Sequence, residues 1–276
     1  MFSSFMVNSW IAATLVAIVA GMVGFFVVLR GSSFAAHALP LGTFPGAAAS
    51  VLLGVNELLG LVVFAAIGVI GIFQLGRRGR HEVATALSLV TLLGLGTLFL
   101  SMTREYSQGV YDMLFGQLLG VSDGQVVAVA AMSAVAIPAV ALVFRPLLLS
   151  SVSDDLAGAR GVSGRRMELC FLVVLAFATA MALPVVGALL VFSLMVGPAA
   201  AARALTDRPV LAMLLSVGLS LLTVWAAIAL SYTTNWPVGF FVGSAGALFY
   251  ALGRAWGRLP RRNMPVDRHV AAAIGH

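Results

Sequence analysis

Long apolar runs separated by short polar segments make up almost the whole of this chain. A helix needs about 20 apolar residues to cross the roughly 30 Å hydrocarbon core of a bilayer. The runs that approach this length predict nine transmembrane helices, near residues 6–29, 34–54, 58–75, 83–101, 125–147, 167–184, 186–204, 209–231 and 236–254. Only Pro184 and Val185 separate the sixth run from the seventh, so a fused, kinked pair would give eight spans. Residues 111–116 are apolar but too short to span, which predicts a re-entrant or interfacial half-helix. The pattern therefore predicts an all-α, polytopic transmembrane bundle.

The apolar runs follow one another without a polar block, which indicates a single membrane domain over residues 1–255. The composition agrees, because 61% of the 276 residues are hydrophobic and only 9% are charged. A soluble domain carries about 25% charged residues. Residues 256–276 differ from the rest, since they combine Arg261 and Arg262 with prolines. We expect them to form a basic, disordered cytoplasmic tail beside the membrane lipid.

The arginines indicate how the bundle is oriented. All sixteen basic residues are arginine, and the cytoplasmic loops of membrane proteins are enriched in basic residues. If the N-terminus lies outside, fifteen of the sixteen fall on the cytoplasmic side and only Arg104 falls outside. The outer segments then carry the acidic residues Glu57, Glu105, Asp112 and Asp123. An odd number of spans places the C-terminus in the cytoplasm.

Several functional classes have no support in the sequence. Nucleic-acid binding needs a basic face on a soluble module, whereas these arginines are scattered between apolar runs. The sequence has no phosphate-binding loop for ATP, no H-E-x-x-H zinc motif and no G-x-S-x-G nucleophile elbow. The single cysteine, Cys170, excludes an intrachain disulfide and a cysteine-based metal cluster. We therefore expect no enzymatic activity, no tightly bound cofactor and no nucleic-acid partner.

The second apolar run contains the ionisable residue that stands out inside a predicted span, His37. Pro40, Gly42, Pro45 and Gly46 follow it, so this helix should be kinked or broken. Irregular backbone at membrane depth is tolerated where it lines a cavity or is buried in protein, and transporters place their pathways at discontinuous helices. A neutral imidazole also binds zinc, manganese or iron. His37 is therefore a candidate pathway ligand, and a packed histidine bonded to a backbone carbonyl is the alternative.

The predicted cytoplasmic loop after the fifth run has the signals of a short helix. Ser153 or Asp154 can cap its start and Gly161 can end it. The acids Asp154 and Asp155 at the start and Arg160 at the end suit the helix dipole. We expect a short surface helix here, and an ordinary polar loop is the alternative.

Four parts of the sequence resemble the membrane-subunit family of ABC importers for zinc, manganese and iron. The first is residues 16–30 with the kinked segment that ends in Phe44, Pro45 and Gly46. The others are residues 114–122, residues 155–162 and residues 185–202. Each stretch alone is weakly specific, but together they keep the order and spacing of the family over most of the chain.

The resemblance implies a permease subunit of the bacterial cytoplasmic membrane that works with several partners. These would be a second copy of the permease, two cytoplasmic ATP-binding subunits, and an extracytoplasmic metal-binding protein that delivers the ion. The predicted surface helix would dock into the ATPase as a coupling segment. The residues expected to carry that role are Asp154, Asp155, Gly158, Arg160 and Gly161.

The resemblance also implies which residues of the second span would line the pathway of the metal ion. In the family, two polar residues one turn apart precede the Pro-Gly pair, and here those positions hold His37 and Leu41. The first position therefore keeps a ligand and the second has lost one. Further candidates for lining the pathway are Ser33, Thr43 and Ser193.

The sequence thus predicts a permease that imports a divalent metal ion, with zinc or manganese ahead of iron. A permease for a metal chelate, such as a siderophore or corrinoid, is the first alternative, because Leu41 fits a pathway with few ligands. A secondary transporter without an ATPase is the second alternative. It would need ionisable residues in several spans, and His37 is the one identified.

Overall fold

The computed structural model describes residues 4–76, 81–102 and 115–258. Helices account for most of these residues, and no strand occurs among them. The helices are α1 (Ser4–Leu29), α2 (Ser33–Gly42), α3 (Phe44–Leu53), α4 (Glu57–Leu75), α5 (His81–Ser101), α7 (Asp123–Val152), α8 (Asp154–Ala159), α9 (Gly164–Val186), α10 (Ala188–Leu205), α11 (Pro209–Thr234) and α12 (Val238–Arg258).

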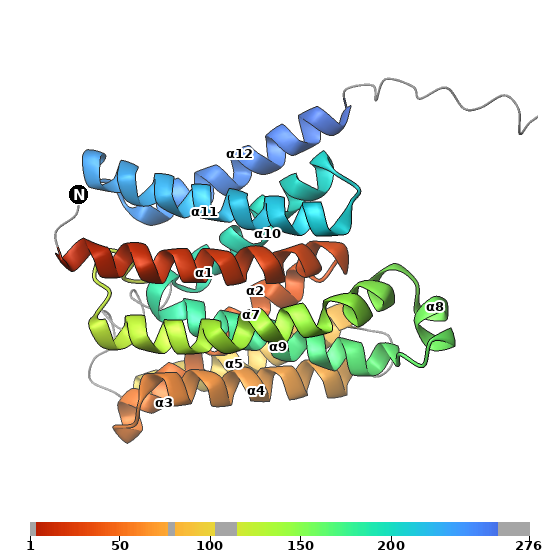
Figure 1. Cartoon of the computed structure of the whole chain (residues 1–276). Helices are drawn as coiled ribbons and strands as arrows, with labels where there is room; N and C mark the ends of the chain where they lie inside the picture. The colour runs from red at the N-terminus through yellow and green to blue at the C-terminus, as the bar shows by residue number, and fades with distance from the viewer. Residues whose placement is uncertain (1–3, 77–80, 103–114, 259–276) are drawn as a thin grey trace, which may run out of the picture.

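The long helices lie side by side, and successive spans run in opposite directions (Figure 1). Nine segments of the described chain are long and apolar enough to cross a bilayer, with α2 and α3 together forming the second. The short helix α8 and the last turn of α12 lie at one end of the bundle, called the α8 end below (Figure 1). The first turn of α1 lies at the opposite end. The predicted all-α bundle of nine spans is therefore confirmed.

The sixth and seventh spans are separate helices, but their junction lies later than the sequence indicated. Helix α9 continues through Pro184 to Val186, and α10 begins at Ala188. Between them, Gly187 has φ 81° and ψ 158°, a conformation that residues with a Cβ rarely adopt. Pro184 removes one backbone donor without ending the helix, whereas Gly187 changes the direction of the chain. The alternative of eight spans is therefore wrong.

The second span is broken at Thr43, which alone separates α2 from α3. Pro40 lies inside α2, and Pro45 lies in the first turn of α3, where a helix needs no backbone donor. The Thr43 hydroxyl donates to the Pro40 carbonyl at 2.7 Å. Its backbone N–H donates to the Leu39 carbonyl at 3.1 Å. The kink is thus bonded internally, which allows it to lie buried in the bundle.

Small residues bring several helices into backbone contact, as expected where lipid supplies no hydrophobic force between helices. A Cβ on Gly21 of α1 would lie 2.6 Å from the Val217 Cα of α11. A Cβ on Gly197 of α10 would lie 2.6 Å from the Gly246 Cα of α12. The Ser216 hydroxyl of α11 also donates to the Gly21 carbonyl at 2.8 Å. Helices α1, α10, α11 and α12 therefore form one closely packed group.

Two sequence predictions fall largely outside the described residues. The half-helix expected at 111–116 is one, because the description resumes only at Phe115. The basic tail is the other, since residues 259–276 are not described. At its described end, α12 continues to Arg258, three residues beyond the predicted domain boundary at 255.

Candidate functional site

His37 lies in the second turn of α2, a helix that packs against α4, α5, α9 and α10. Its ring meets the Phe192 ring of α10 edge to face, with the ring centroids 5.0 Å apart. The Nδ1 atom is buried and has no hydrogen-bond partner among the described residues. Nδ1 therefore makes no hydrogen bond to a backbone carbonyl of the described residues.

An unpartnered nitrogen in the protein interior has an energetic cost. Leaving a buried polar group without a hydrogen bond destabilises a protein by about 1–3 kcal/mol, and native proteins contain few such groups. The edge-to-face contact with Phe192 holds the imidazole in place without occupying Nδ1. The arrangement therefore places an oriented imidazole with an unpartnered nitrogen inside a broken span.

The other predicted pathway residues are used in different ways. The Thr43 hydroxyl is fully buried and bonded to Pro40 within the kink. The Ser193 hydroxyl donates to the Val242 carbonyl of α12 at 3.4 Å, so it contributes to helix packing. Ser33 is half-buried at the start of α2. Leu41, one turn beyond His37, is half-buried and packs against the hydrophobic core. The hydroxyl protons of Thr43 and Ser193 are therefore already bonded to backbone carbonyls.

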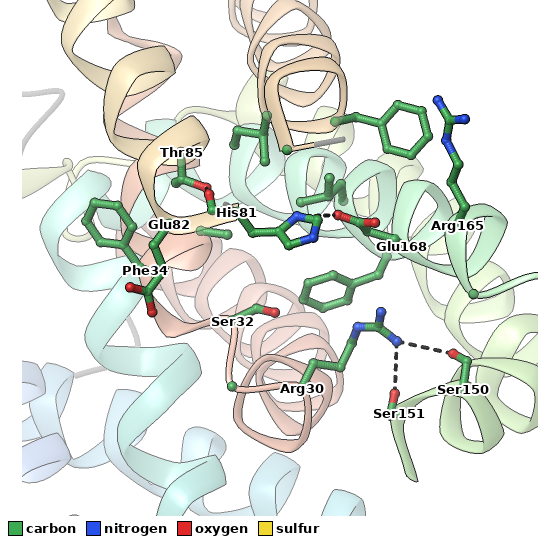
Figure 2. Close-up of a pocket in the computed structure, with 18 residues that line it drawn as sticks. Arg30, Ser32, Phe34, His81, Glu82, Thr85, Ser150, Ser151, Arg165 and Glu168 are labelled. Carbon is green, nitrogen blue, oxygen red and sulfur yellow. Dashed lines mark hydrogen bonds and ion pairs between the residues drawn. The ribbon is translucent and has the colours of Figure 1, made fainter. Parts of the chain in front are cut away.

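A cavity of about 790 Å³ opens at the α8 end (Figure 2). It lies among the ends of α1, α2, α4, α5, α7 and α9. Its polar lining includes Arg30, Ser32, His81, Glu82, Thr85, Ser150, Ser151, Arg165 and Glu168. Phe34 and Ala35 of α2 also line it, so the cavity reaches the helical turn that precedes His37.

Two arginines of this cavity are held against aromatic rings. The Arg30 guanidinium lies 5.3 Å from the centre of the Phe171 ring. It also donates to the hydroxyls of Ser150 and Ser151 at 3.2 and 3.1 Å. The Arg165 guanidinium lies 4.9 Å from the centre of the Phe73 ring. These contacts restrain both positive charges in the lining of the cavity.

A second cavity, of about 390 Å³, lies at the opposite end of the bundle. It is lined by Ala47 and Ser50 of α3 together with the polar side chains of Glu57, Gln117 and Gln125. The broken span therefore contributes to both cavities, with α2 reaching one and α3 the other. Between them, Ala36, Leu39 and Thr43 are buried, so packed side chains separate the two cavities in this conformation.

The predicted surface helix is present as α8. The Ser153 hydroxyl accepts a hydrogen bond from the Leu156 N–H at 3.3 Å, so Ser153 is the N-cap. Gly161 ends the segment with φ 74°, and the Val162 N–H donates to the Ala157 carbonyl at 2.9 Å. Ala157 packs inward and is fully buried, whereas Leu156 is 60% exposed.

The predicted coupling residues are all placed in this segment. Asp154 begins α8, Arg160 caps its end, and Asp155, Gly158, Arg160 and Gly161 are exposed. The segment therefore presents a short, capped helix with an exposed apolar side chain beyond the ends of α7 and α9.

His81 and Glu168 meet in the lining of the cavity at the α8 end, and neither is among the site residues predicted from the sequence. His81 Nδ1 and Glu168 Oε1 are 2.9 Å apart. Glu168 lies inside the predicted sixth span, and an ionisable residue in a span was the signal that could have identified it. The pairing itself joins residues 87 positions apart, which one sequence alone does not reveal.

Within the described residues, no group of three or more His, Cys, Asp and Glu side chains is arranged to hold a metal ion. A tight zinc site uses three or four ligands. A pathway differs from such a site, because an ion that binds along it must also leave. The side chains described above are therefore suited to transient contact with a cation.

Comparison with known proteins places this architecture among transport proteins. The profile of the ABC 3 transport family matches residues 2–253. The manganese import system permease protein ScaB of Streptococcus pneumoniae is 30% identical over 255 residues, which cover 90% of this chain and 89% of the relative. The high-affinity zinc uptake system membrane protein ZnuB of Buchnera aphidicola is 25% identical over 83% of this chain and 88% of its own. Among solved structures, PsaBC from Streptococcus pneumoniae in complex with Fab matches with a TM-score of 0.81 and 26% identity, covering 91% of both chains.

Proposed function

Because this chain belongs to the ABC 3 transport family, we propose that it is the membrane-spanning permease subunit of an ABC importer for a divalent metal ion. The family and the nine apolar helices make it a multi-pass protein of the bacterial cytoplasmic membrane. The proposed cargo is manganese or zinc, ahead of iron. Manganese is the first ion to test, because a relative with 30% identity is named for manganese import and one with 25% for zinc uptake.

The observation that supports this proposal best is the position of His37. It is an oriented imidazole with an unpartnered Nδ1, on a broken span that reaches a cavity at each end of the bundle. Manganese, zinc and iron all accept imidazole ligands. An ion that enters from the cavity opposite the α8 end would meet His37 before it reaches the cavity at the α8 end.

The closed segment between the two cavities fits a gated pathway. Residues around the Thr43 kink are packed and bonded to one another, so an ion cannot pass until helices shift. Helix α8 is the element through which we propose that ATP-driven closure of a partner causes that shift. Asp154, Asp155, Gly158, Arg160 and Gly161 would form the contact with the ATPase.

The proposed assembly contains more than this chain. We propose a homodimer of permease subunits, two cytoplasmic ATP-binding subunits and an extracytoplasmic metal-binding protein, surrounded by membrane lipid. In this division of labour the permease hydrolyses nothing, and ATP hydrolysis takes place in the partner. The N-terminus would lie outside and the α8 end in the cytoplasm.

ATP-dependent uptake into lipid vesicles tests the proposal. The permease would be reconstituted with its ATPase and binding protein, and uptake of manganese, zinc and iron would be compared for wild type and His37→Ala. We expect uptake of at least one metal, and we expect His37→Ala to reduce it at least tenfold, because the pathway loses its ligand. Leu41→Ala is the matched control, since it shortens the neighbouring side chain on the same face without removing a ligand.

The possible outcomes separate the parts of the proposal. Equal loss in His37→Ala and Leu41→Ala would assign His37 a packing role and remove its role as a ligand. Transport of none of the three ions by an assembled, ATP-hydrolysing complex would overturn the metal assignment. Uptake of a metal chelate by the same vesicles would then identify the alternative substrate.

A further inference from the structure

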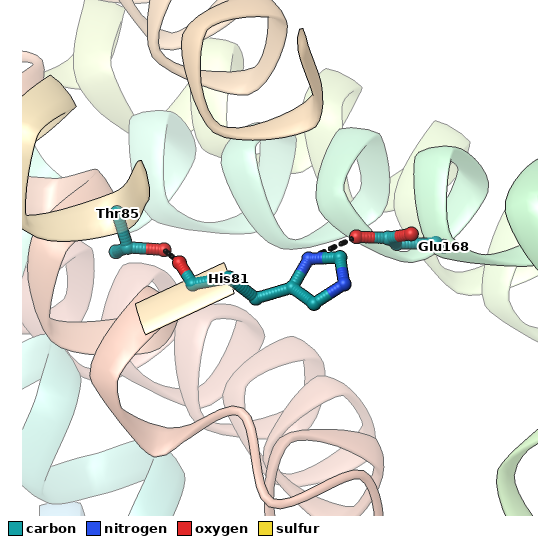
Figure 3. Close-up of polar contacts among 3 residues, drawn as sticks. All are labelled: His81, Thr85 and Glu168. Atoms are coloured by element: carbon teal, nitrogen blue, oxygen red, sulfur yellow. Dashed lines mark hydrogen bonds and ion pairs between the residues drawn. The ribbon is translucent and has the colours of Figure 1, made fainter. Parts of the chain in front are cut away.

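The side chains of His81 and Glu168 point toward each other (Figure 3), and both line the cavity at the α8 end. His81 is the first residue of α5, and Glu168 lies in the second turn of α9. The hydroxyl of Thr85 donates to the His81 carbonyl at 2.7 Å, which fixes the first turn of α5. The His81 side chain is 53% exposed and the Glu168 side chain is 26% exposed. The pair is therefore held on two helices and accessible from the cavity.

Building on the function proposed above, we propose that His81 and Glu168 form a transient coordination site for the transported divalent cation. The site would receive the ion after it passes His37 and release it at the α8 end. Phe34 lines the cavity and precedes His37 by three residues, a rise of about 4.5 Å along α2. An ion that leaves His37 toward the α8 end therefore enters this cavity within one helical turn.

The spacing of the two ligand atoms suits a metal ion. Two adjacent ligands placed about 2.1 Å from an octahedral ion lie about 3 Å apart. The separation of His81 Nδ1 and Glu168 Oε1 is 2.9 Å, so an ion can bind both atoms without moving α5 away from α9. Coordination through Nδ1 leaves the ring proton on Nε2. Nitrogen and carboxylate oxygen are also a ligand pair that manganese and zinc accept.

The surroundings keep such a site weak. The pair provides two protein ligands, and no group of three ligating side chains occurs among the described residues, so water would complete the coordination. Arg30 and Arg165 line the same cavity and repel a cation. Their contacts with Phe171 and Phe73 restrain this positive charge within the cavity lining. Weak binding is what an exit site needs, because the ion must leave for the cytoplasm.

A purely structural role explains the pair less well. Ion pairs between partly exposed side chains typically contribute about 0–1 kcal/mol to stability. Helices α5 and α9 are each held to α4 and α2 by packing that does not involve this pair. The two ionisable side chains nevertheless point into a polar cavity at the mouth of the bundle (Figure 2). A ligand role accounts for both their location and their chemistry.

Binding of Mn²⁺ to the full-length permease in lipid nanodiscs, without ATPase, tests the proposal. Bound and free Mn²⁺ would be separated by electron paramagnetic resonance, in wild type, Glu168→Gln, His81→Gln, Glu168→Asp and His37→Ala. We expect a weak class of sites whose affinity falls about tenfold or more in Glu168→Gln and in His81→Gln. Glu168→Asp should retain most of the affinity, because it keeps a carboxylate. Because His37 is a separate proposed ligand, His37→Ala should remove its own binding and leave the binding that depends on His81 and Glu168.

Glu82→Gln is the matched control, because Glu82 is a second carboxylate on the same cavity and loses the same charge. An affinity in Glu168→Gln equal to that of wild type would overturn the proposal. So would an equal loss in Glu82→Gln, which would show general electrostatic attraction instead of coordination. The vesicle experiment measures transport, whereas this one measures binding. If the exit site is wrong, Glu168→Gln binds Mn²⁺ like wild type while the vesicles still take up metal. If the importer function is wrong, the vesicles take up no metal, whatever the binding result.

Discussion

At the scale of single residues, the proposed role of His37 depends on two features of its surroundings: Nδ1 has no hydrogen-bond partner, and Leu41 provides no second ligand. Nδ1 is buried without a hydrogen-bond partner, while Phe192 holds the ring in place. Leu41, one turn further along α2, packs into the core and provides no ligand. The pathway proposed here therefore rests on one side chain where the family pattern has two. A single ligand favours rapid passage over tight binding.

This argument predicts the effect of restoring the second ligand. Histidines four residues apart share one face of a helix and can bind one metal ion, so Leu41→His should create a two-ligand site with His37. We expect the KM for manganese uptake to fall about tenfold, and kcat to fall as well because the ion leaves more slowly. Both constants would be measured in the reconstituted importer.

Leu41→Phe is the control for this substitution, because it also introduces a ring but no ligand atom. Similar kinetics for Leu41→His and Leu41→Phe would contradict a ligand position at residue 41. A lower KM in Leu41→His that disappears when His37→Ala is added would tie the effect to the pair.

The sequence identified His37 but gave less guidance on its surroundings. Residue type and span position were enough to select an imidazole inside an apolar run. The hydrogen-bond partners of the hydroxyls could not be predicted in this way. Thr43 bonds to Pro40 within the kink, and Ser193 bonds to Val242 of α12, a contact that depends on helix packing. The contact between His81 and Glu168 depends on how α5 and α9 pack, which periodicity does not determine.

At the scale of helices, breaks and caps were predicted from residues with strong local preferences. Pro40 and Pro45 indicated the interruption in the second span, and the break lies at Thr43 between them. Ser153 and Gly161 indicated the limits of α8: Ser153 is its N-cap, and Gly161, with φ 74°, follows its C-cap Arg160. The junction of α9 and α10 lies at Gly187, later than Pro184 and Val185 predicted. A proline can lie within a helix, whereas φ 81° marks the position where the helix stops.

Helix α8 carries a prediction about the ATPase. Leu156 is 60% exposed on this helix and Ala157 is buried beneath it, so Leu156 is the apolar side chain that a partner could cover. Leu156→Asp should lower the amount of ATPase that copurifies with the permease at least tenfold, a loss of about 1.4 kcal/mol or more. The permease itself should keep its thermal stability, because the changed side chain is exposed.

Val55→Asp is the matched control, because Val55 is an exposed apolar residue at the opposite end of the bundle, with 49% of its surface accessible. It should leave ATPase copurification unchanged. Equal binding of the ATPase by Leu156→Asp and wild type would exclude this face of α8 as the contact.

At the scale of the whole molecule, the arginines of the described chain gather at one end of the bundle, although acidic residues occur at both ends. The arginines of the described chain, such as Arg30, Arg160 and Arg208, belong to segments at the α8 end. Glu57 and Asp123 begin helices at the other end. The sequence predicted this division because loops alternate between the two sides of a membrane, and the bundle places the segments accordingly. The positive-inside tendency therefore predicts that the α8 end faces the cytoplasm.

The single cysteine makes this orientation directly testable. In a Cys170→Ala background, one new cysteine would be placed at Val55 and, in a separate variant, at Ala159 of α8, since both positions are exposed. A maleimide that cannot cross the membrane should label Val55→Cys in intact spheroplasts. It should label Ala159→Cys only after the membrane is permeabilised. The reverse pattern would invert the topology and place α8 where no cytoplasmic ATPase could reach it, so the same measurement also tests whether α8 can act in coupling.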